Sequence, residues 1–342
     1  MANYKRRDLM VKTVEAAFEN FLKDYVNLDK VETDRARKSR DWLVNQQIKI
    51  FPDKEETFPN LYNEKSIYFG SFARKTKIKE LDDIDIMIAL SAENGSYVEY
   101  LDKVEIIVEE NANMLRKLCF DNSNKLNSRK VINKFIELLN KIPQYEYSEI
   151  KRNQEAATLK LSSYKWNFDI VPCFFTKKDL NGDTRYLIPD GNGNWKKTDP
   201  RIEKSIISEL NQINDGKLLD VIRVIKYWNR NSMAPTVSSY LLEVIILNYY
   251  QDNNKLNQNI SLEIPNVLDH IQKTIYNMIF SPDNPRVNIN NLTQEEKDKI
   301  SRKAIEHFEI SQNAINFAAS FKYEKAINEW RKVFGKNFPL YD

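Results

Sequence analysis

The chain has 342 residues, of which 42% are hydrophobic, so it can form a stable globular core in one large domain or in two lobes. Its 52 basic and 49 acidic residues give a net charge of +3, which argues against the concentrated basic surface of a strong nucleic-acid binder. The two cysteines and two histidines are too few and too widely spaced to favour a disulfide framework, a zinc site or a histidine-based catalytic triad.

Two amphipathic helices are predicted at the start of the chain. Apolar residues recur at roughly helical spacing from residue 8 to about 26, and a second helix is predicted from about 34 to 50. Arg35, Arg37 and Arg40 fall within the second helix, and we expect them to lie on its solvated face.

Short strands and one clear helix are predicted over the next 150 residues. Residues 66–69 form a short apolar run typical of a buried strand, and residues 84–90 form a second, isoleucine-rich strand. The region after the polar stretch 93–96 is predicted to be mainly helical, with its clearest helix at 129–141. Further strands are predicted at 145–150, 157–161, 166–175 and 186–188.

Beyond Pro200 the pattern becomes almost wholly helical, which places a lobe boundary near residue 200. We therefore predict two domains, a first lobe with the N-terminal helices at 1–200 and a helical lobe at 201–342. The helices of the second lobe are predicted at 202–213, 217–230, 238–250, 265–280, 294–316 and 321–333.

The segment Asp83-Ile84-Asp85 carries the chemical argument. Residues at i and i+2 of a strand point to the same face, so Asp83 and Asp85 project together while Ile84 enters the core. A divalent cation that prefers oxygen ligands, such as Mg²⁺, relieves the repulsion between two such carboxylates. Gly70-Ser71, where a strand gives way to a helix, can present backbone N–H groups and a hydroxyl to phosphate oxygens.

A third carboxylate, Asp169, lies inside the predicted strand 166–175. A carboxylate in a buried strand needs a partner, and alignment beside Asp83 and Asp85 would supply one through shared metal ions. Two metal ions can activate an attacking hydroxyl and stabilise a leaving pyrophosphate, with Asp169 as the acceptor of the hydroxyl proton. Each motif alone is a weak signal, but their combination predicts a metal-dependent catalytic site.

Together these motifs resemble the DNA polymerase β-like nucleotidyltransferase superfamily, and most closely its bacterial CD-NTase branch, which is related to cyclic GMP–AMP synthase and oligoadenylate synthetase. The resemblance covers most of the chain from about 60 to 250. It implies an α+β fold: a polymerase β-like nucleotidyltransferase lobe with a mixed sheet, an N-terminal spine helix and a C-terminal helical lobe that closes the nucleotide cleft. It is carried by residues 70–76, 83–85, 168–172, 188–191 and 198–200.

The helical lobe extends the resemblance. Ile225-Lys226-Tyr227-Trp228-Asn229 resembles the family helix whose lysine contacts the triphosphate. Ser238-Ser239-Tyr240-Leu241-Leu242-Glu243 resembles the next helix, in which a serine contacts phosphate and a tyrosine stacks on a base. The residues expected to bind the nucleotide are therefore Gly70, Ser71, Lys226, Ser239 and Tyr240.

The resemblance also implies the activity and its partners. We expect a nucleotidyltransferase that makes a cyclic di- or trinucleotide from NTPs for antiphage signalling, with two Mg²⁺ ions, or Mn²⁺ in their place, held by Asp83, Asp85 and Asp169. No effector-like domain is evident, so we expect a separate effector protein that responds to the product, and no stable nucleic-acid complex. The chain has no run of about 18 apolar residues and no apolar N-terminal segment, so we expect a cytoplasmic protein without a membrane span.

Other interpretations remain open from the sequence. The same chemistry could extend an RNA end or make linear 2′–5′ oligonucleotides. The fold could instead serve a catalytically inactive nucleotide-binding protein, although the presence of all three aspartates argues against it. A toxin–antitoxin nucleotidyltransferase would share Gly-Ser and D-x-D, but the helical lobe with its Ser-Ser-Tyr disfavours it. The bases joined, the linkage, the ring size and the activating signal are not readable from the sequence.

Overall fold

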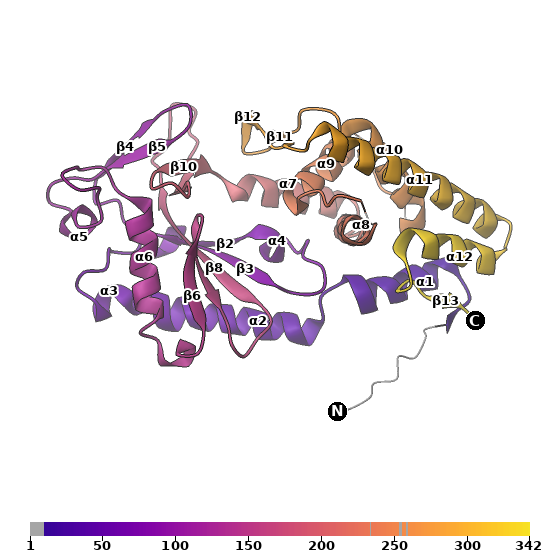
Figure 1. The fold of residues 1–342 in the computed structure, drawn as a ribbon, viewed down its shortest axis with the longest axis horizontal. Helices are drawn as coiled ribbons and strands as arrows, with labels where there is room; N and C mark the ends of the chain where they lie inside the picture. Colours follow the sequence, from indigo (N-terminus) through magenta and orange to yellow (C-terminus); the bar gives the residue numbers. More distant parts are fainter. Residues whose placement is uncertain (1–9, 233, 253–254, 258) are drawn as a thin grey trace. The chain divides into compact units, whose positions relative to one another are not determined.

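The computed structural model describes residues 10–342 except 233, 253–254 and 258, and the chain forms two compact units (Figure 1). The first, called here the sheet unit, consists of Lys30–Lys75 and Leu81–Arg201. The second, called here the helical unit, consists of Ile202–Asp342, the segment Thr76–Glu80 and the described residues before Lys30.

A nine-stranded mixed sheet forms the centre of the sheet unit. Its strands follow the order β2-β3-β8-β9-β10-β5-β4, and the β6–β7 hairpin pairs with β8 through β7. β3 and β8 are parallel, whereas the other pairs in this sheet are antiparallel. The strands are β2 Ile67–Phe69, β3 Asp83–Ala89, β4 Ser96–Glu99, β5 Val104–Ile107, β6 Glu149–Asn153, β7 Ala156–Lys160, β8 Asn167–Phe175, β9 Tyr186–Pro189 and β10 Trp195–Thr198.

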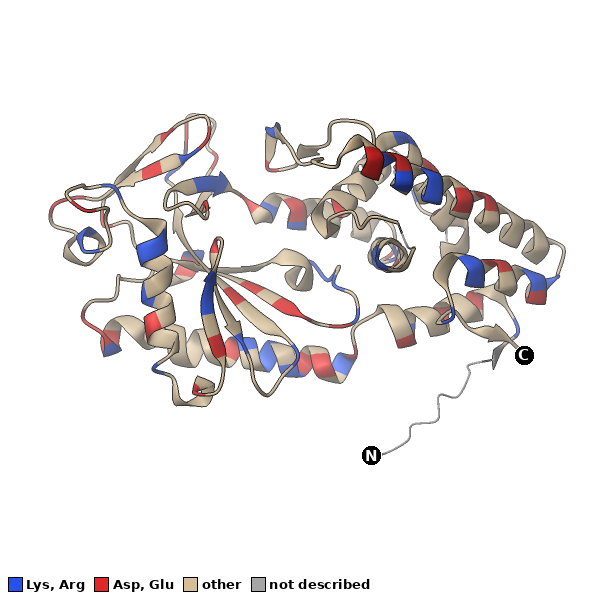
Figure 2. Ribbon diagram, viewed as in Figure 1, with Lys and Arg blue, Asp and Glu red and all other residues tan. Residues whose placement is uncertain are grey.

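The two faces of the central strands differ in polarity. Alternation along β3 buries Ile84 and Ile86 and leaves Asp83 and Asp85 half-buried on the opposite face. Figure 2 shows acidic residues, in red, along the central strands. β8 repeats the pattern, because its Asp169 is half-buried between two fully buried neighbours. This alternation is what brings acidic side chains to one face without placing charge in the core.

Five α-helices complete the sheet unit. The amphipathic helix α6 packs against β6, β7, β8 and β9, and it begins at the N-cap Asn127, whose side chain accepts from two backbone N–H groups of the first turn. The other helices are shorter or more exposed, and α2 carries mostly charged residues (Figure 2). The helices are α2 Lys30–Trp42, α3 Phe51–Lys54, α4 Gly70–Ala73, α5 Asn113–Arg116 and α6 Ser128–Leu139.

The helical unit surrounds an apolar core in which aromatic rings from both ends of the chain meet. The Phe18 ring lies 5.0 Å from that of Trp330 and 5.1 Å from that of Phe338, both edge to face. Two small sheets, β1–β13 and β11–β12, accompany the helices. The helices are α1 Val14–Phe21, extended by a π-helical turn Leu22–Val26, then α7 Pro200–Ile213, α8 Leu218–Asn231, α9 Ser239–Asp252, α10 Ile260–Thr274, α11 Gln294–Ala319 and α12 Tyr323–Phe334.

The structure confirms the predicted α+β class with a mixed sheet, and it corrects the elements at several places. The region after residue 96 was predicted to be mixed and mainly helical, but its first part forms the hairpin β4–β5. The helix predicted at 265–280 begins at Ile260 and ends at Thr274, and β10 was not predicted. The start of the first predicted helix, at residue 8, lies outside the described residues.

The two units also differ from the predicted lobes at the N-terminus. Residues 1–200 were predicted as one lobe with the N-terminal helices, whereas α1 belongs to the helical unit. The physical reason is the burial of Phe18 and Phe21 against α12 and the C-terminal Phe338. The boundary after Arg201 lies close to the predicted position near 200.

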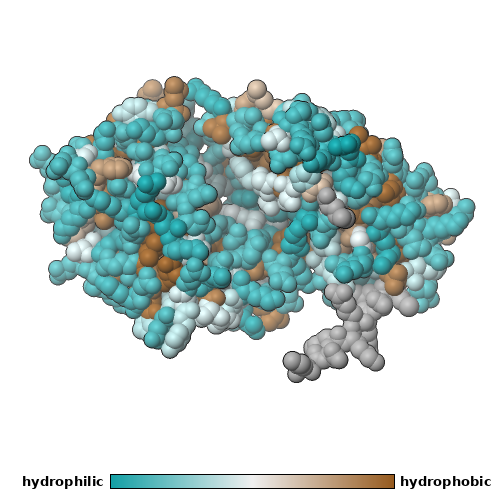
Figure 3. Space-filling model, viewed as in Figure 1, coloured by the Kyte–Doolittle hydropathy of each residue, from teal (hydrophilic) through white to brown (hydrophobic). Residues whose placement is uncertain are grey.

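The face shown in Figure 3 is mainly hydrophilic. Lys, Arg, Asp and Glu alternate over the exposed helices (Figure 2), and on the face shown in Figure 3 the hydrophobic residues are scattered among hydrophilic ones. Among the described residues, no helix combines the length and the hydrophobicity needed to cross a membrane.

Candidate active site

Three aspartates meet at one end of the polar face of the central sheet. Asp85 on β3 and Asp169 on β8 are register partners on adjacent parallel strands, and Asp83 lies two residues before Asp85 on the same face. Adjacent strands are about 4.8 Å apart, so the Asp85 and Asp169 carboxylates are neighbours. The fold therefore brings together the three acidic residues singled out from the sequence, and their catalytic role stays a prediction.

Gly70 joins the glycine–serine motif to the aspartates. It follows β2, opens α4 and has a φ of 69°, a left-handed conformation that favours glycine. A Cβ at this position would lie 1.7 Å from Asp85 Oδ2. The sequence analysis assigned this glycine to close approach of a phosphate, but the contact that the structure shows is with the Asp85 carboxylate. Ser71 is the second residue of the same turn.

Thr158 is a site residue that the sequence analysis missed. Its hydroxyl donates a hydrogen bond of 2.5 Å to Asp169 Oδ1, because Thr158 on β7 is the antiparallel register partner of Asp169. The bond fixes the direction of the Asp169 carboxylate. Only the strand register, which the sequence pattern does not give, could have identified this threonine.

The carboxylate oxygens of the three aspartates are the type of ligand that a hard divalent cation prefers. The aspartates do not form a complete metal site by themselves. Within the described part of the chain, no group of three Asp, Glu, His or Cys side chains is arranged to hold a metal ion unaided. Mg²⁺ is commonly held by one or two carboxylates together with substrate phosphates, rather than by an all-protein cage. Asp83, Asp85 and Asp169 supply an all-oxygen set of this kind, which phosphate oxygens would complete.

Lys226, on α8 of the helical unit, is held by a buried carboxylate. Its ammonium donates to Glu243 Oε1 at 2.7 Å, and both side chains are buried, with 5% and 2% exposed. The Thr76 hydroxyl donates to the same Glu243 oxygen at 3.0 Å. Glu243 and Thr76 were not assigned roles from the sequence, although an acid and a base within two apolar helices are a signal of pairing. The triphosphate contact of Lys226 stays a prediction.

Ser239 and Tyr240 lie in the first turn of α9. The preceding Ser238 accepts a hydrogen bond from the Leu241 backbone N–H, and Ser239 is exposed. The Tyr240 hydroxyl donates to Glu203 at 2.6 Å and contacts Ser281 Oγ at 2.7 Å. Burial, and secondly the bond to Glu203, raise the pKa of Tyr240, so the phenol remains protonated at neutral pH. These bonds fix the ring, and its predicted stacking on a base is untested.

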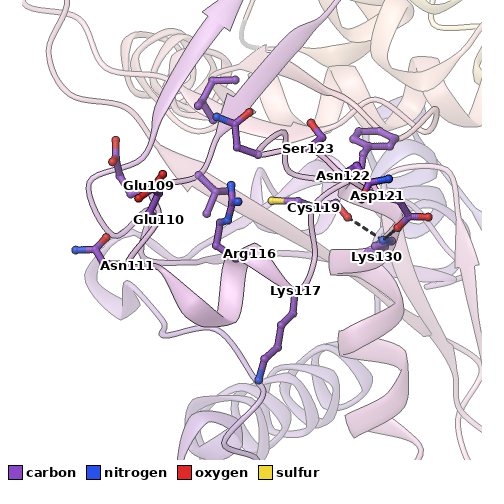
Figure 4. A pocket seen from close by; sticks show the side chains of 14 residues that line it. Glu109, Glu110, Asn111, Arg116, Lys117, Cys119, Asp121, Asn122, Ser123 and Lys130 are labelled. Carbon is purple, nitrogen blue, oxygen red and sulfur yellow. Dashed lines mark hydrogen bonds and ion pairs between the residues drawn. The ribbon is translucent and has the colours of Figure 1, made fainter.

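One cavity lies elsewhere in the sheet unit, and none of the predicted site residues lines it. It has a volume of about 1050 Å³ and is lined by β5, α5 and the loop before α6 (Figure 4). Its side chains are of mixed charge, and Lys130 already donates to Asp121 and to the Cys119 carbonyl. Because its charges are mixed and it contains none of the three aspartates, we place the candidate active site at β3 and β8 instead.

Comparison with known proteins identifies the family of the chain. A protein of Bacillus cereus (strain VD146), named as a probable cyclic nucleotide synthase, is 46% identical over 335 residues, which is 97% of this chain and 100% of that protein. The cyclic AMP-AMP-AMP synthase of Escherichia coli (strain MS 115-1) is 23% identical over 350 residues, covering 93% and 95% of the two chains. No protein-family model matches the chain.

Solved structures show the same fold. E. coli MS115-1 CdnC with ATP superposes with a TM-score of 0.69 at 19% identity, covering 95% of this chain and 98% of that one. CdnC in its complex with HORMA-deltaN gives the same TM-score at 21% identity and the same coverage. At these identities the likeness establishes the fold, and the 46% identical relative establishes the family.

Proposed function

The chain belongs to the bacterial CD-NTase family, and we propose that it is a nucleotidyltransferase that joins NTPs into a cyclic di- or trinucleotide. The names of both sequence relatives support cyclic nucleotide synthesis. The observation that carries the proposal is the register of β3 and β8, which places Asp85 beside Asp169 and next to Gly70.

The chain's own residues have separable tasks in this reaction. Gly70 and Ser71, with Lys226 and Ser239, hold the triphosphate of the donor nucleotide. Asp169, oriented by Thr158, accepts the proton of the acceptor ribose hydroxyl. The hydroxyl oxygen then attacks the α-phosphorus, the bond to the bridging oxygen breaks, and pyrophosphate leaves. Most of the rate enhancement comes from positioning and charge neutralisation.

We further propose that Asp83, Asp85 and Asp169 hold two Mg²⁺ ions together with the nucleotide phosphates. The support is the all-oxygen donor set that Asp83, Asp85 and Asp169 form on one sheet face. When bound, the ions would lower the pKa of the attacking hydroxyl and neutralise charge on the leaving pyrophosphate. Mn²⁺ has the same preference for oxygen ligands and is expected to substitute.

We also propose that the product acts on a separate effector protein in antiphage signalling. A solved complex of CdnC with HORMA-deltaN supports the general idea that such a synthase works with protein partners. The cytoplasm is the proposed compartment, supported by two cysteines that are both buried and unpaired as disulfides. None of these roles depends on a stable nucleic-acid complex.

Product analysis tests the proposed activity. We expect the purified protein with an NTP mixture and Mg²⁺ to release pyrophosphate and form a small cyclic nucleotide, identified by mass spectrometry.

Asp85→Asn and Asp169→Asn should each lower the rate by at least about 100-fold, because each removes a charge that the transition state requires. Asp82→Asn is the matched control, since Asp82 is exposed and precedes β3.

The same experiment separates the competing activities. Linear oligonucleotides alone, or nucleotide addition only when an RNA end is supplied, would replace the cyclic synthase with a transferase of another product class. Tight NTP binding without pyrophosphate release would indicate an inactive nucleotide-binding protein. Undiminished activity in both Asp→Asn variants would remove the proposed site.

A further inference from the structure

A second cavity, of about 920 Å³, lies at the opposite end of the central strands from the three aspartates. Leu90, which follows β3, and Phe175, the last residue of β8, both line it. Phe175 lies six residues after Asp169, which at about 3.3 Å per residue is roughly 20 Å along the strand. None of the residues assigned to the catalytic site lines this cavity.

Three lysines give the cavity a positive charge. Lys65, Lys177 and Lys178 all line it, and within the described residues none of them forms an ion pair with a carboxylate. The Lys65 ammonium lies 4.6 Å from the centre of the Phe175 ring. The single acidic side chain among the described lining residues is Glu93, which accepts a hydrogen bond from the Asn60 amide. The cavity is therefore suited to an anion.

Aromatic rings lie beside these cations. Tyr62 and Tyr97 line the cavity with 40% and 38% of their area exposed, so parts of both rings remain open to solvent. Exposed rings next to unpaired cations are the features that bind nucleotides, because every base offers a face for stacking and every phosphate attracts lysine. The volume falls within the usual range for small-molecule sites, about 300–1,000 Å³.

The walls of the cavity are fixed before any ligand binds. Arg201 donates to both Asp199 oxygens at 2.7 Å and to the Thr184 carbonyl at 2.9 Å, and its guanidinium lies 5.2 Å from the Phe175 ring centre. On the other side, a Cβ added to Gly95 would lie 2.9 Å from two backbone carbonyl oxygens. Only glycine fits this tight turn, which sets the loop that follows β3.

We propose that this cavity is a second nucleotide-binding site, which takes a nucleoside phosphate independently of the catalytic aspartates. The phosphates pair with Lys65, Lys177 and Lys178, and the base stacks on Tyr62. A free NTP and the oligonucleotide product share this chemistry, so both are candidate ligands. The site goes beyond the proposed activity, because binding here requires neither metal ions nor catalysis.

Calorimetric titration with ATP in EDTA isolates this site, since binding at the aspartates is expected to need divalent ions. We expect one ATP to bind per chain. The triple variant Lys65→Gln, Lys177→Glu, Lys178→Glu should weaken binding at least 10-fold. Lys54→Glu, an exposed lysine outside the cavity, is the matched control and should bind as the wild type does. Melting curves verify that each variant is folded.

Further binding measurements identify the ligand. Tyr62→Ala should weaken ATP binding several-fold and leave pyrophosphate binding unchanged, since only ATP carries a base to stack. Binding of the purified reaction product more tightly than ATP would assign the site to the product, and the reverse order would assign it to the substrate. Either order supports a second nucleotide site.

Several outcomes would overturn the proposal. The proposal is wrong if the wild type does not bind ATP in EDTA or if the triple variant binds ATP as tightly as the wild type. It is also wrong if the double variant Asp83→Asn/Asp85→Asn loses ATP binding in EDTA. Equal binding of ATP and a Glu-rich peptide would also contradict a nucleotide site. Each of these results leaves cyclic nucleotide synthesis untouched, because that activity is measured separately by product formation with Mg²⁺.

Discussion

At the scale of single residues, the site depends on contacts that link motifs distant in sequence. Gly70 lies under the Asp85 carboxylate, and Thr158 holds one oxygen of Asp169. The glycine–serine and D-x-D motifs therefore form one structural unit, in which the glycine makes room for the Asp85 carboxylate. This explains why both motifs occur together at a short spacing.

Replacing Gly70 should disable the site without unfolding the chain. In Gly70→Ala, the new methyl group would collide with Asp85 Oδ2, 1.7 Å away, so the carboxylate must move. We expect cyclic product formation to fall at least about 100-fold, since misplacement by about 1 Å has such effects. Gly182→Ala is the matched control, because Gly182 also has positive φ but an added Cβ meets no atom within 4 Å. Equal activity of the two variants would contradict this account.

Thr158 should act by positioning Asp169. In Thr158→Val the shape is kept and the hydrogen bond to Asp169 is lost. We expect kcat to fall about 10-fold and the Mg²⁺ requirement to rise, as happens when a partner of a metal-binding group is removed. The measurement is pyrophosphate release as a function of Mg²⁺ concentration. The control Thr57→Val removes a hydroxyl that is bound to Glu55 outside the site, and it should change neither kcat nor the Mg²⁺ requirement. Wild-type kinetics in Thr158→Val would refute the positioning role of Thr158.

At the scale of elements, the sequence predicted the bounds of a strand best where buried and exposed residues alternate regularly along it. β3 and β8 lie within one residue of the predicted bounds, because alternation of aspartate with isoleucine or phenylalanine marks a half-buried strand. β4 was missed because all four of its residues are exposed in an edge strand, so no apolar alternation marks it. The helix predicted at 265–280 lies instead at Ile260–Thr274 and contains Pro265, although proline favours the first turn of a helix over its interior.

The packing of α1 on α12 gives a prediction for the helical unit. Phe18 is 1% exposed and contacts Trp330, Phe334 and Phe338. Phe18→Ala should lower the free energy of unfolding of this unit by about 3–5 kcal/mol, the usual cost of a buried phenylalanine. Urea denaturation followed by tryptophan fluorescence would report it. The control Phe321→Ala removes a ring that is 81% exposed and should change stability by less than about 0.5 kcal/mol.

At the scale of the whole molecule, the sequence singled out the three aspartates but not the residues that hold the candidate site residues in place. The aspartates carry a signal in their own spacing, whereas Thr158 and Glu243 acquire roles only through register and helix packing.

Charged and polar groups that fold into the interior also make stability depend on pH. Glu105 illustrates the acidic side, because hydrogen bonds from Lys103 and Lys125 lower its pKa to about 2.

His307 should govern the loss of stability in mildly acidic solution. Burial lowers its pKa from 6.5 to about 4, and its Nδ1 accepts a hydrogen bond of 2.7 Å from Trp228. Between these pKa values the unfolded chain binds more protons than the native one, so stability should fall as pH drops from about 6.5 to 4, by up to about 2 kcal/mol at pH 5. Burial also lowers the pKa of His270, which acts in the same direction. His307→Phe should flatten the dependence of the melting temperature on pH between 7 and 5, whatever the absolute stability of the variant. A slope equal to that of the wild type would show that other groups control this pH dependence.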